Sequence, residues 1–415
     1  MTTTNTPTTF FGLGIAPKVL EVLARMKFVV PTPIQHKAIP MAVEGKDIMG
    51  IAQTGTGKTL AFAIPMVQRL AQEPIGIGLV VVPTRELAIQ VEETFNKVAQ
   101  PFGLRTAILI GGASMEEQLR AIKKGARILI ATPGRLIDHM QRGTVRLQTT
   151  RVLVLDEADR MFDMGFAPQI EQILQQVPKE RQTMLFSATM PRDIMAMASR
   201  HMKLPINIEV APQGTAAERV VQEIFVVRRE MKSILLQKIL GQYRGSILIF
   251  SRTKHGASKL VREIKAMTHS AAEIHSDRSL SQRRQALEGF KVGRYRILVA
   301  TDIAARGIDV KGIELVINYD LPDDAENYVH RIGRTGRAGM EGRAISIATP
   351  DQADQIQAIE RCMRSEIKLA EHPEIETQKL YRAPSRSASS GSSSRRPSSG
   401  GRSFRGKSFG GRRRF

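Results

Sequence analysis

The chain has 415 residues, 42% of them hydrophobic, which is enough for two sizeable globular cores. Its 61 Lys and Arg residues against 40 Asp and Glu give a net charge of +21 and favour a polyanionic partner such as nucleic acid. The single cysteine, Cys362, excludes an intramolecular disulfide and a cysteine-based zinc cluster. No apolar stretch approaches the ~20 residues needed to span a bilayer, and residues 1–9 lack the basic and apolar parts of a signal sequence. We therefore expect a cytoplasmic protein without membrane contact.

Short apolar runs alternate with segments of helical period through residues 48–210, which predicts an α/β fold with a doubly wound parallel sheet. The clearest helical segments are residues 84–100 and 115–124. Residues 211–219 are small and turn-prone, as in an interdomain linker. A second alternating series then predicts a second, similar domain. The strands expected in the two domains are residues 48–51, 78–82, 105–110, 128–131, 152–155 and 183–186, and then 221–227, 247–250, 272–275, 296–300, 315–319 and 344–348.

A phosphate-binding loop is predicted directly after the first expected strand. Glycines at this point let backbone N–H groups fold around phosphate oxygens, and the N-terminus of the following helix adds favourable partial charge. The Lys58 side chain can reach terminal phosphates, and the Thr59 hydroxyl can bind Mg²⁺. The loop consists of Ala52, Gln53, Thr54, Gly55, Thr56, Gly57, Lys58 and Thr59.

Paired acids follow the apolar run 152–155, which is typical of a strand buried on both faces. Such a strand directs the carboxylates at its carboxyl end into the crevice where ligands bind in an open parallel sheet. Beside a phosphate loop, Asp156 fits the acid that holds Mg²⁺ through its water shell. Glu157 fits the base that orients or deprotonates the attacking water. The alternative is a solvated acidic strand end, and the phosphate loop argues against it.

Further motifs accompany these two in both halves of the chain. In the first half they are Pro31-Thr32-Pro33-Ile34-Gln35 with Phe28 before it, Pro83-Thr84-Arg85-Glu86-Leu87-Ala88, Gly111-Gly112, Thr132-Pro133-Gly134-Arg135, Asp156-Glu157-Ala158-Asp159 and Ser187-Ala188-Thr189. In the second half they are Ile249-Phe250-Ser251-Arg252-Thr253, Ala300-Thr301-Asp302, Arg306-Gly307-Ile308-Asp309 and His330-Arg331-Ile332-Gly333-Arg334-Thr335-Gly336-Arg337. With these motifs in this order, residues 10–350 resemble the DEAD-box RNA helicase family.

The resemblance implies two tandem RecA-like domains, with ATP and Mg²⁺ bound between them. The expected division is an N-terminal segment with the adenine-reading motif (1–36), an ATP-binding domain (37–210), a linker (211–219), a helicase C-terminal domain (220–372) and a disordered basic tail rich in Ser, Gly and Arg (373–415). Residues 382–415 contain ten basic residues and no acidic one. Their Arg, Gly and Phe residues make this segment a candidate RNA anchor, and a merely solubilising end is the alternative.

The resemblance also implies a role for individual residues. Phe28 stacks on adenine, Gln35 reads it, and Asp309 contacts the ribose. Arg334 and Arg337 are three residues apart, share one face of a helical turn, and reach across the cleft as arginine fingers. The residues that couple hydrolysis to strand separation are Asp159, Ser187, Thr189 and His330. RNA phosphate and sugar contacts come from Thr84, Arg85, Gly112, Thr132, Gly134 and Arg135 in the first domain and from Arg252 and Thr301 in the second.

The expected function is RNA-stimulated ATP hydrolysis coupled to unwinding of short RNA duplexes or remodelling of RNA–protein complexes. An ATP-gated RNA clamp with little turnover uses the same motifs and stays open as an alternative. The adenine-reading motif and the Asp-Glu-Ala-Asp spelling argue against a DNA helicase. A monomer is expected, with ribosomal precursors or RNA-degradation complexes as candidate assemblies. Within the family, residues 302–307 and the basic tail resemble the bacterial RhlE group.

The chain departs from the family pattern at three positions. Lys27 stands where the family usually has Gly, which affects the local turn before Phe28. Ser276 replaces the usual Gly, and Leu280 occupies a position often taken by Gln. For this reason no RNA contact is assigned to the loop that contains Ser276 and Leu280.

Overall fold

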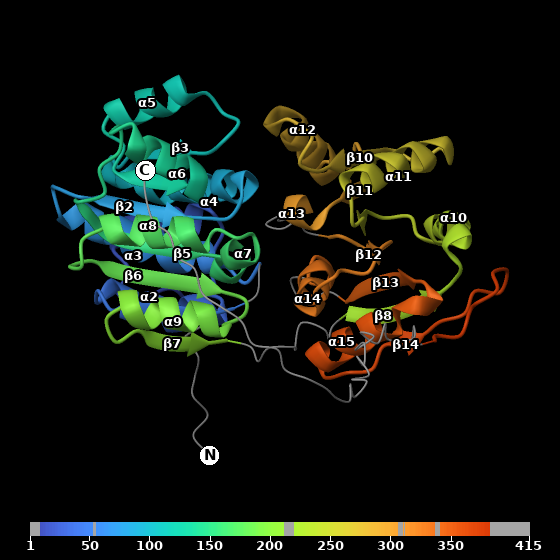
Figure 1. Cartoon of the computed structure of the whole chain (residues 1–415). Coiled ribbons are helices and arrows are strands. Elements are labelled where there is room, and N and C mark those ends of the chain that lie inside the picture. The colour runs from blue at the N-terminus through green and yellow to red at the C-terminus, as the bar shows by residue number, and fades with distance from the viewer. Residues whose placement is uncertain are drawn as a thin grey trace, which may run out of the picture.

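The computed structural model describes residues 9–52, 55–210, 220–305, 310, 312–336 and 341–381. They form two α/β domains of the same plan that lie side by side (Figure 1). The predicted linker and residues 382–415 of the tail lie outside the described residues. The same holds for four predicted site residues, which are Gln53, Thr54, Asp309 and Arg337.

The first domain is built around a parallel sheet of seven strands. The strand that ends at Ser187 lies between the strand before the phosphate loop and the strand before the paired acids. The three predicted motifs therefore meet at one edge of the sheet, where the parallel strands end. The strands in spatial order are β3 (Thr106–Leu109), β4 (Ile128–Ala131), β2 (Ile77–Val81), β5 (Thr150–Asp156), β6 (Gln182–Ser187), β1 (Ile48–Ile51) and β7 (Ile206–Glu209).

The second domain has a sheet of the same design, again with seven strands and parallel pairing. Its strand order matches that of the first sheet position by position, so β8 takes the place of β1 and β12 the place of β5. The strands in spatial order are β10 (Ala271–Ile274), β11 (Ile297–Ala300), β9 (Ile247–Phe250), β12 (Leu315–Asn318), β13 (Gly342–Ala348), β8 (Val220–Val226) and β14 (Lys368–Leu369).

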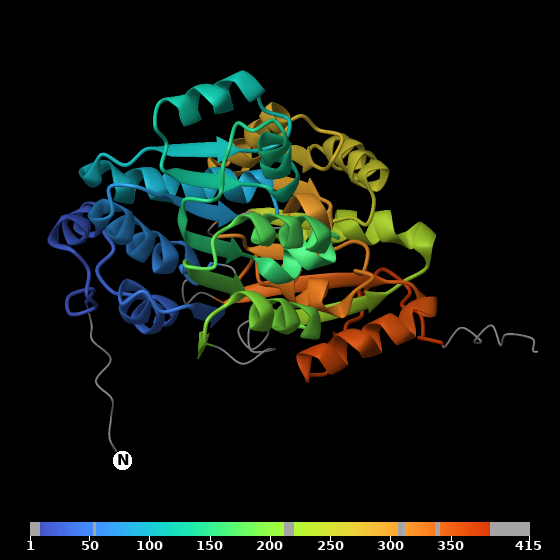
Figure 2. The ribbon, with the colours of Figure 1, turned by 60° about the vertical axis from the view of Figure 1, so that its left-hand side comes forward.

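Helices cover both faces of each sheet (Figures 1 and 2). Each domain accordingly has two hydrophobic clusters, one on either side of its sheet. The helices are α1 (Pro17–Arg25), α2 (Pro33–Val43), α3 (Lys58–Gln72), α4 (Arg85–Ala99), η1 (Gln100–Phe102), α5 (Met115–Lys123), α6 (Pro133–Gln141), α7 (Ala158–Asp163), α8 (Ala167–Gln176) and α9 (Arg192–His201), followed in the second domain by η3 (Arg229–Met231), α10 (Lys232–Gln242), α11 (Lys254–Ala266), α12 (Leu280–Lys291), α13 (Asp302–Ala305), α14 (Ala325–Ile332), η4 (Pro350–Gln352) and α15 (Ala353–Met363).

The N-terminal segment belongs to the core of the first domain. Phe10, Val19, Leu23 and Ile34 are buried in the same hydrophobic cluster as β1 and α3. Between α1 and α2, Lys27 has a backbone φ of 60°, a left-handed conformation that glycine adopts at much lower cost than other residues. This conformation explains why the family usually has Gly where this chain has Lys27.

The predicted α/β fold with two doubly wound parallel sheets is confirmed. β1, β4 and β9 have the predicted bounds, because each is a continuous apolar run buried on both faces. The edge strands β7 and β14 were not predicted. β14 has only two residues, both exposed, and β7 buries only one of its four residues well.

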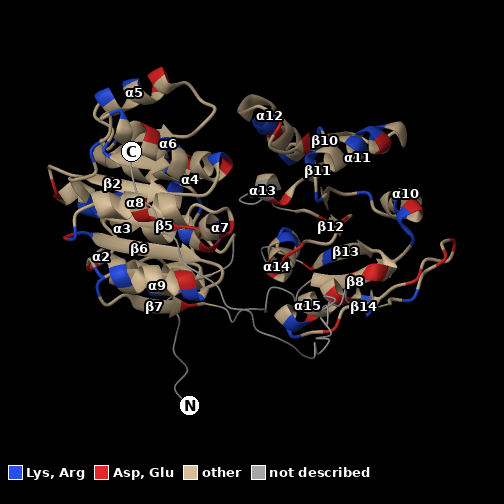
Figure 3. Ribbon diagram, viewed as in Figure 1, with Lys and Arg blue, Asp and Glu red and all other residues tan. Residues whose placement is uncertain are grey.

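Charged residues lie on the helices and loops of both domains, and the strands are mostly uncharged (Figure 3). Basic and acidic side chains are interspersed on the helices. No helix within the described residues is both long enough and apolar enough to cross a membrane.

Candidate functional site

The described residues of the loop after β1 have features of a phosphate cradle. Gly57 ends the loop with a φ of 88°, and a Cβ there would lie 2.4 Å from Gln35 Nε2. That amide nitrogen donates to the Gly57 carbonyl at 3.0 Å, while Gln35 Oε1 accepts from Thr32 N at 2.9 Å. Lys58 Nζ crosses the loop and donates to the Ala52 carbonyl at 2.7 Å. Gln35 thus ties the predicted adenine-reading motif directly to the phosphate loop.

The structure places Phe28 and Thr59, the predicted adenine and Mg²⁺ residues, near the phosphate loop's two flanking helices, α2 and α3. Phe28 is 40% exposed just before α2, so its ring has a face available for a base. Thr59 lies in the first turn of α3, next to Lys58.

The paired acids at the end of β5 are buried and differ sharply in their electrostatics. Burial raises the pKa of Asp156 to about 7, although nearby Lys58 works against the shift. Burial also acts to raise the pKa of Glu157, but the positive charges of Arg160, Lys58 and Arg334 outweigh it and lower that pKa to about 2. Glu157 Oε2 lies 2.7 Å from Arg160 Nη1. Glu157 is therefore held as a carboxylate.

The backbone of Glu157 is strained. Its φ of 52° is left-handed, and the residue caps α7 immediately after β5. A non-glycine residue in this conformation costs about 1–3 kcal/mol and persists only where its surroundings enforce it. Here the turn directs the carboxylate toward Arg160 and the cleft between the domains.

Arg334 brings positive charge to this carboxylate from the second domain. Helix α14 ends at Ile332, and Arg334 lies in the turn after it. Arg334 is 3% exposed, and its Nε donates to the His330 carbonyl at 3.2 Å. Of the two predicted arginine fingers, the described structure therefore places Arg334 within electrostatic reach of Glu157.

Arg331, in the same motif, has a structural role. It is 2% exposed, and its guanidinium pairs with both carboxylate oxygens of Asp302, at 2.5 and 2.7 Å. It also donates to Asn318 Oδ1 and to the Asp320 carbonyl, and lies over the ring of Phe250. These contacts join α14 to three strand ends of the second sheet.

The predicted coupling residues of the first domain form one hydrogen-bond network. Asp159 N donates to Ser187 Oγ at 3.0 Å. Asp159 Oδ2 accepts from Ala188 N at 3.0 Å, from Thr189 N at 2.8 Å and from Thr189 Oγ1 at 3.2 Å. The last member of the Asp-Glu-Ala-Asp motif is thus bound to the end of β6.

The hydrogen bond from this network to the second domain involves a residue that sequence reasoning missed. Thr189 Oγ1 lies 3.3 Å from Glu326 Oε2, at the start of α14. His330, the predicted link, lies one turn later on the same helix. An acidic residue near a helix N-terminus is common, so the sequence contained no signal for Glu326.

A cavity of about 470 Å³ opens between the domains on the side of α4, α6 and α12. Five of the six RNA contacts predicted for the first domain line it. The sixth, Gly112, lies against Arg85, since a Cβ on Gly112 would be 2.5 Å from Arg85 Nη1. The lining residues are Pro83, Thr84, Arg85, Glu86, Gly111, Thr132, Gly134, Arg135, Asp138, Met164, Phe166, Ser276, Arg283 and Ala304.

Local hydrogen bonds shape the first-domain wall of this cavity. Thr84 Oγ1 accepts from Leu87 N and caps α4. Arg135 on α6 donates to the carbonyls of Ile110, at 3.0 Å, and Ala113, at 2.6 Å. Arg135 thereby holds both ends of the loop that contains Gly112.

Two further contacts across the cleft were not predicted. Glu86 of the first domain pairs with Arg283 of α12 at 2.7 Å, and both side chains are buried. Leu280, the departure from the family pattern, packs against the core cluster of the first domain. An unpaired Glu86 would repel RNA phosphates, so the pairing makes the cavity compatible with a polyanion.

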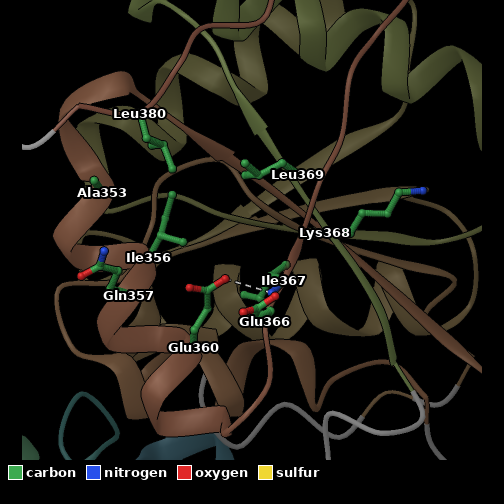
Figure 4. A pocket seen from close by; sticks show the side chains of 9 residues that line it. All are labelled: Ala353, Ile356, Gln357, Glu360, Glu366, Ile367, Lys368, Leu369 and Leu380. Atoms are coloured by element: carbon green, nitrogen blue, oxygen red, sulfur yellow. Dashed lines mark hydrogen bonds between the residues drawn. The ribbon is translucent and has the colours of Figure 1, made fainter.

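Arg252 and Thr301 do not line this cavity. Arg252 follows β9, and its guanidinium donates to the Leu321 carbonyl and pairs with Asp323 at 3.4 Å. Thr301 follows β11, directly before α13. Another hollow, in the second domain between α15, β14 and Leu380 (Figure 4), has a volume of about 740 Å³ and is lined by none of the predicted site residues.

The donor set around the phosphate loop fits ATP with Mg²⁺. The cradle at Gly57, the lysine at Lys58 and the buried carboxylate at Asp156 are the groups that a nucleotide triphosphate and a hard cation require. The described part of the chain holds no cluster of three or more His, Cys, Asp or Glu residues suited to a metal. A Mg²⁺ ion here would therefore depend on phosphate and water ligands beside Thr59 and Asp156.

Comparison with known proteins gives a consistent result. Residues 32–197 match the DEAD/DEAH box helicase family, and residues 230–339 match the helicase conserved C-terminal domain. The chain is 43% identical over 371 residues to the DEAD-box ATP-dependent RNA helicase CshA of Geobacillus kaustophilus, which covers 89% of this chain and 79% of that protein. This relative is not named as an RhlE protein, so the RhlE subgroup stays a prediction.

Solved structures add information on the arrangement of the domains. S. cerevisiae Dbp5 bound to RNA and ADP BeF3 superposes with a TM-score of 0.78 at 30% identity, over 88% of this chain and 95% of that one. A DEAD box protein of Methanococcus jannaschii is more similar in sequence, at 37% identity over 88% of this chain and 99% of that one, but has a TM-score of 0.53. We infer that the two domains here are arranged much as in the RNA-bound Dbp5 structure.

Proposed function

This chain belongs to the DEAD/DEAH box helicase family and is an ATP-dependent RNA helicase, and we propose that its site residues form one composite centre that both domains complete. A single observation carries the proposal. Glu157 of the first domain has its pKa lowered by charges on its own domain and by Arg334 of the second. Hydrolysis therefore depends on closure of the cleft, because only closure brings Arg334 to the site.

The phosphate loop binds the substrate ATP, with Lys58 at the terminal phosphates and the aromatic face of Phe28 against adenine. Gln53, Thr54 and Asp309 remain part of the proposed ATP site, although they lie outside the described residues. Thr59 and Asp156 would hold Mg²⁺, which when bound neutralises charge on the phosphates. Gln35 transmits the presence of a base to the phosphate loop through Gly57.

Glu157 acts on the attacking water. A general base is most effective when its pKa lies near the working pH, and a carboxylate with a pKa of about 2 is a weak base. Glu157 therefore orients the water as a hydrogen-bond acceptor and takes up its proton late. Arg334 stabilises the negative charge that develops on the transferred phosphoryl group, and Arg337 is proposed to assist it.

RNA binds through its backbone. Thr84, Arg85, Gly112, Thr132, Gly134 and Arg135 contact one side of the strand, and Arg252 and Thr301 contact it from the second domain. Phosphate and sugar contacts carry no sequence information, so sequence preference is weak and binding falls steeply with salt. Asp159, Ser187, Thr189 and His330 couple closure around RNA to the ATP site. The CshA relative is named a helicase, which favours unwinding over the clamp.

The finer assignments are a monomer, a cytoplasmic location, and RNA of ribosomal precursors or RNA-degradation complexes as the target. The net charge of +21 supports a polyanionic target. Crosslinking RNA to the protein in cells and sequencing that RNA tests the target directly. Recovery of neither class of RNA would contradict it.

Substitution Glu157→Gln tests the composite centre. The amide keeps the size of the side chain and cannot accept the proton, so we expect RNA-stimulated ATP turnover to fall about 10²–10⁴-fold. Nucleotide titration should show that ATP still binds. Because Arg160 loses a charged partner, thermal unfolding is measured in parallel.

The matched control is Glu180→Gln, which removes an exposed glutamate of the same domain and should leave turnover unchanged. Unchanged turnover in Glu157→Gln would show that the assignment is wrong.

A further inference from the structure

The hydroxyl of Thr189 lies between two carboxyl groups from different domains. Its Oγ1 is 3.2 Å from Asp159 Oδ2 and 3.3 Å from Glu326 Oε2. Thr189 and Asp159 belong to the first domain, and Glu326 lies in the first turn of α14 in the second domain. This is therefore a contact that exists only while the cleft is closed.

One hydroxyl carries one hydrogen and cannot donate to both carboxyl groups at once. Asp159 Oδ2 already accepts from Ala188 N and Thr189 N, and Oδ1 accepts from Arg160 N. Four donors converge on the two oxygens of Asp159, and the Thr189 hydrogen belongs in this cluster. Glu326 then faces a lone pair of the hydroxyl and can complete the second hydrogen bond only if it carries a proton itself.

The surroundings of Glu326 favour the protonated form. Burial raises the pKa of Glu326, and the negative charges of Asp324, Asp163 and Asp159 raise it further, while the Thr189 hydroxyl opposes the shift. Of these acids, Asp324 lies at the start of α14, and the other two lie on α7. Helix α15 contributes Cys362, and His330 follows one turn later on α14.

We propose that Glu326 is a positioning residue of the coupling network. When the domains close around RNA, its protonated carboxyl group donates a hydrogen bond to Thr189. The proposal rests on the composite centre described above. Glu326 is distant from Asp159 and Asp163 when the domains are apart. Closing the cleft therefore makes Glu326 take up one proton from solvent.

The direction of the pH effect follows from this uptake. A carboxyl whose pKa is higher in the closed state favours closure while it is protonated, and this contribution is lost as the pH rises through the raised value. RNA-dependent closure should therefore weaken with rising pH in a range above the ordinary glutamate pKa of about 4.3.

The test uses the full chain and measures the RNA concentration that half-saturates ATP turnover, between about pH 5 and pH 8. In the wild type this concentration should rise with pH. In Glu326→Gln this RNA concentration should stay low and should not change with pH, because an amide donates to Thr189 Oγ1 without titrating. In Glu326→Ala it should be about 2- to 10-fold higher than in Glu326→Gln at every pH, as expected for one lost hydrogen bond.

Asp324→Asn is the matched control. It removes a neighbouring negative charge and keeps a side chain able to cap α14, so the pH dependence should persist with its midpoint at lower pH. The inference would be overturned if the half-saturating RNA concentration of Glu326→Gln depended on pH as steeply as that of the wild type. Failure of the composite centre itself would look different, because RNA would then not stimulate turnover in the wild type at any pH.

Discussion

The two domains share one sheet order and divide the chemistry between them. Each strand of the first sheet has a counterpart in the second, from β3 and β10 at one edge to β7 and β14 at the other. In the first domain, β1 is followed by the glycine-rich phosphate loop. In the second, β8 is followed by Val227, Arg228 and the short helix η3. Among the described residues, the glycine-rich cradle at this strand position therefore occurs in the first domain alone.

The strand ends proposed to contact RNA occur in both domains. Thr84 after β2 caps α4, and Thr253 after the equivalent strand β9 caps α11 in the same way. Thr132 follows β4, and Thr301 follows the equivalent β11. Repetition of backbone contacts suits a partner that is itself a repeating phosphate chain. The comparison teaches how the proposed roles divide: the second domain would supply RNA contacts and the positive charge of Arg334, and the first domain would add the chemistry.

The largest expected effect concerns Arg334, the second-domain arginine proposed to act on the ATP site across the cleft. Arg334→Ala should lower RNA-stimulated ATP turnover about 10³-fold or more, because an arginine from a second body stabilises transition-state charge. Binding of ATP to the first domain should change little. Single-turnover hydrolysis with saturating RNA measures the effect. Turnover within a few-fold of wild type would break the proposed division of labour.

Arg331, three residues earlier, provides the control for Arg334. Arg331→Ala removes one partner of a buried ion pair and should cost about 3–5 kcal/mol in the free energy of unfolding of the second domain. Arg334→Ala should leave the second domain folded, so a comparison of urea unfolding separates a catalytic arginine from a structural one.

A smaller effect is expected when one arginine proposed to contact the RNA backbone is replaced in each domain. Arg85→Gln and Arg252→Gln should each weaken RNA binding at all sequences and lower the salt dependence by about one counterion. The losses should add in the double variant, because the residues belong to different domains. Fluorescence anisotropy with labelled RNA over a salt series measures both quantities. A slope that neither variant changes would mean that these guanidinium groups do not contact phosphate.

The smallest effect is confined to the first domain. Lys27→Gly replaces a residue with a φ of 60° and should raise the stability of that domain by about 1 kcal/mol. Urea unfolding followed in each domain separately should show a shift in the first transition, with the second unchanged. A lower midpoint for the first domain would mean that the Lys27 side chain contributes more than its backbone costs.

The central strands and the phosphate loop were predictable from sequence because local patterns determine them. Ile48–Ile51 and Ile247–Phe250 are continuous apolar runs, and Lys58 and Thr59 follow the loop glycines at a fixed spacing. The two edge strands were missed because they bury little surface. Glu326, Glu86 and Arg283 were missed because charged residues on helices are usually solvated and carry no pattern of their own.

By itself, the sequence determined which residues stand at the ends of which buried strands, because strand burial and loop glycines act over a few neighbouring residues. Only the tertiary structure decided which of these strand ends meet across the cleft. Thr189 and Glu326 are 137 positions apart and belong to different domains, so their 3.3 Å contact depends on how both domains sit. The same holds for Arg334, because its charge lowers the pKa of Glu157 only when both domains are in place.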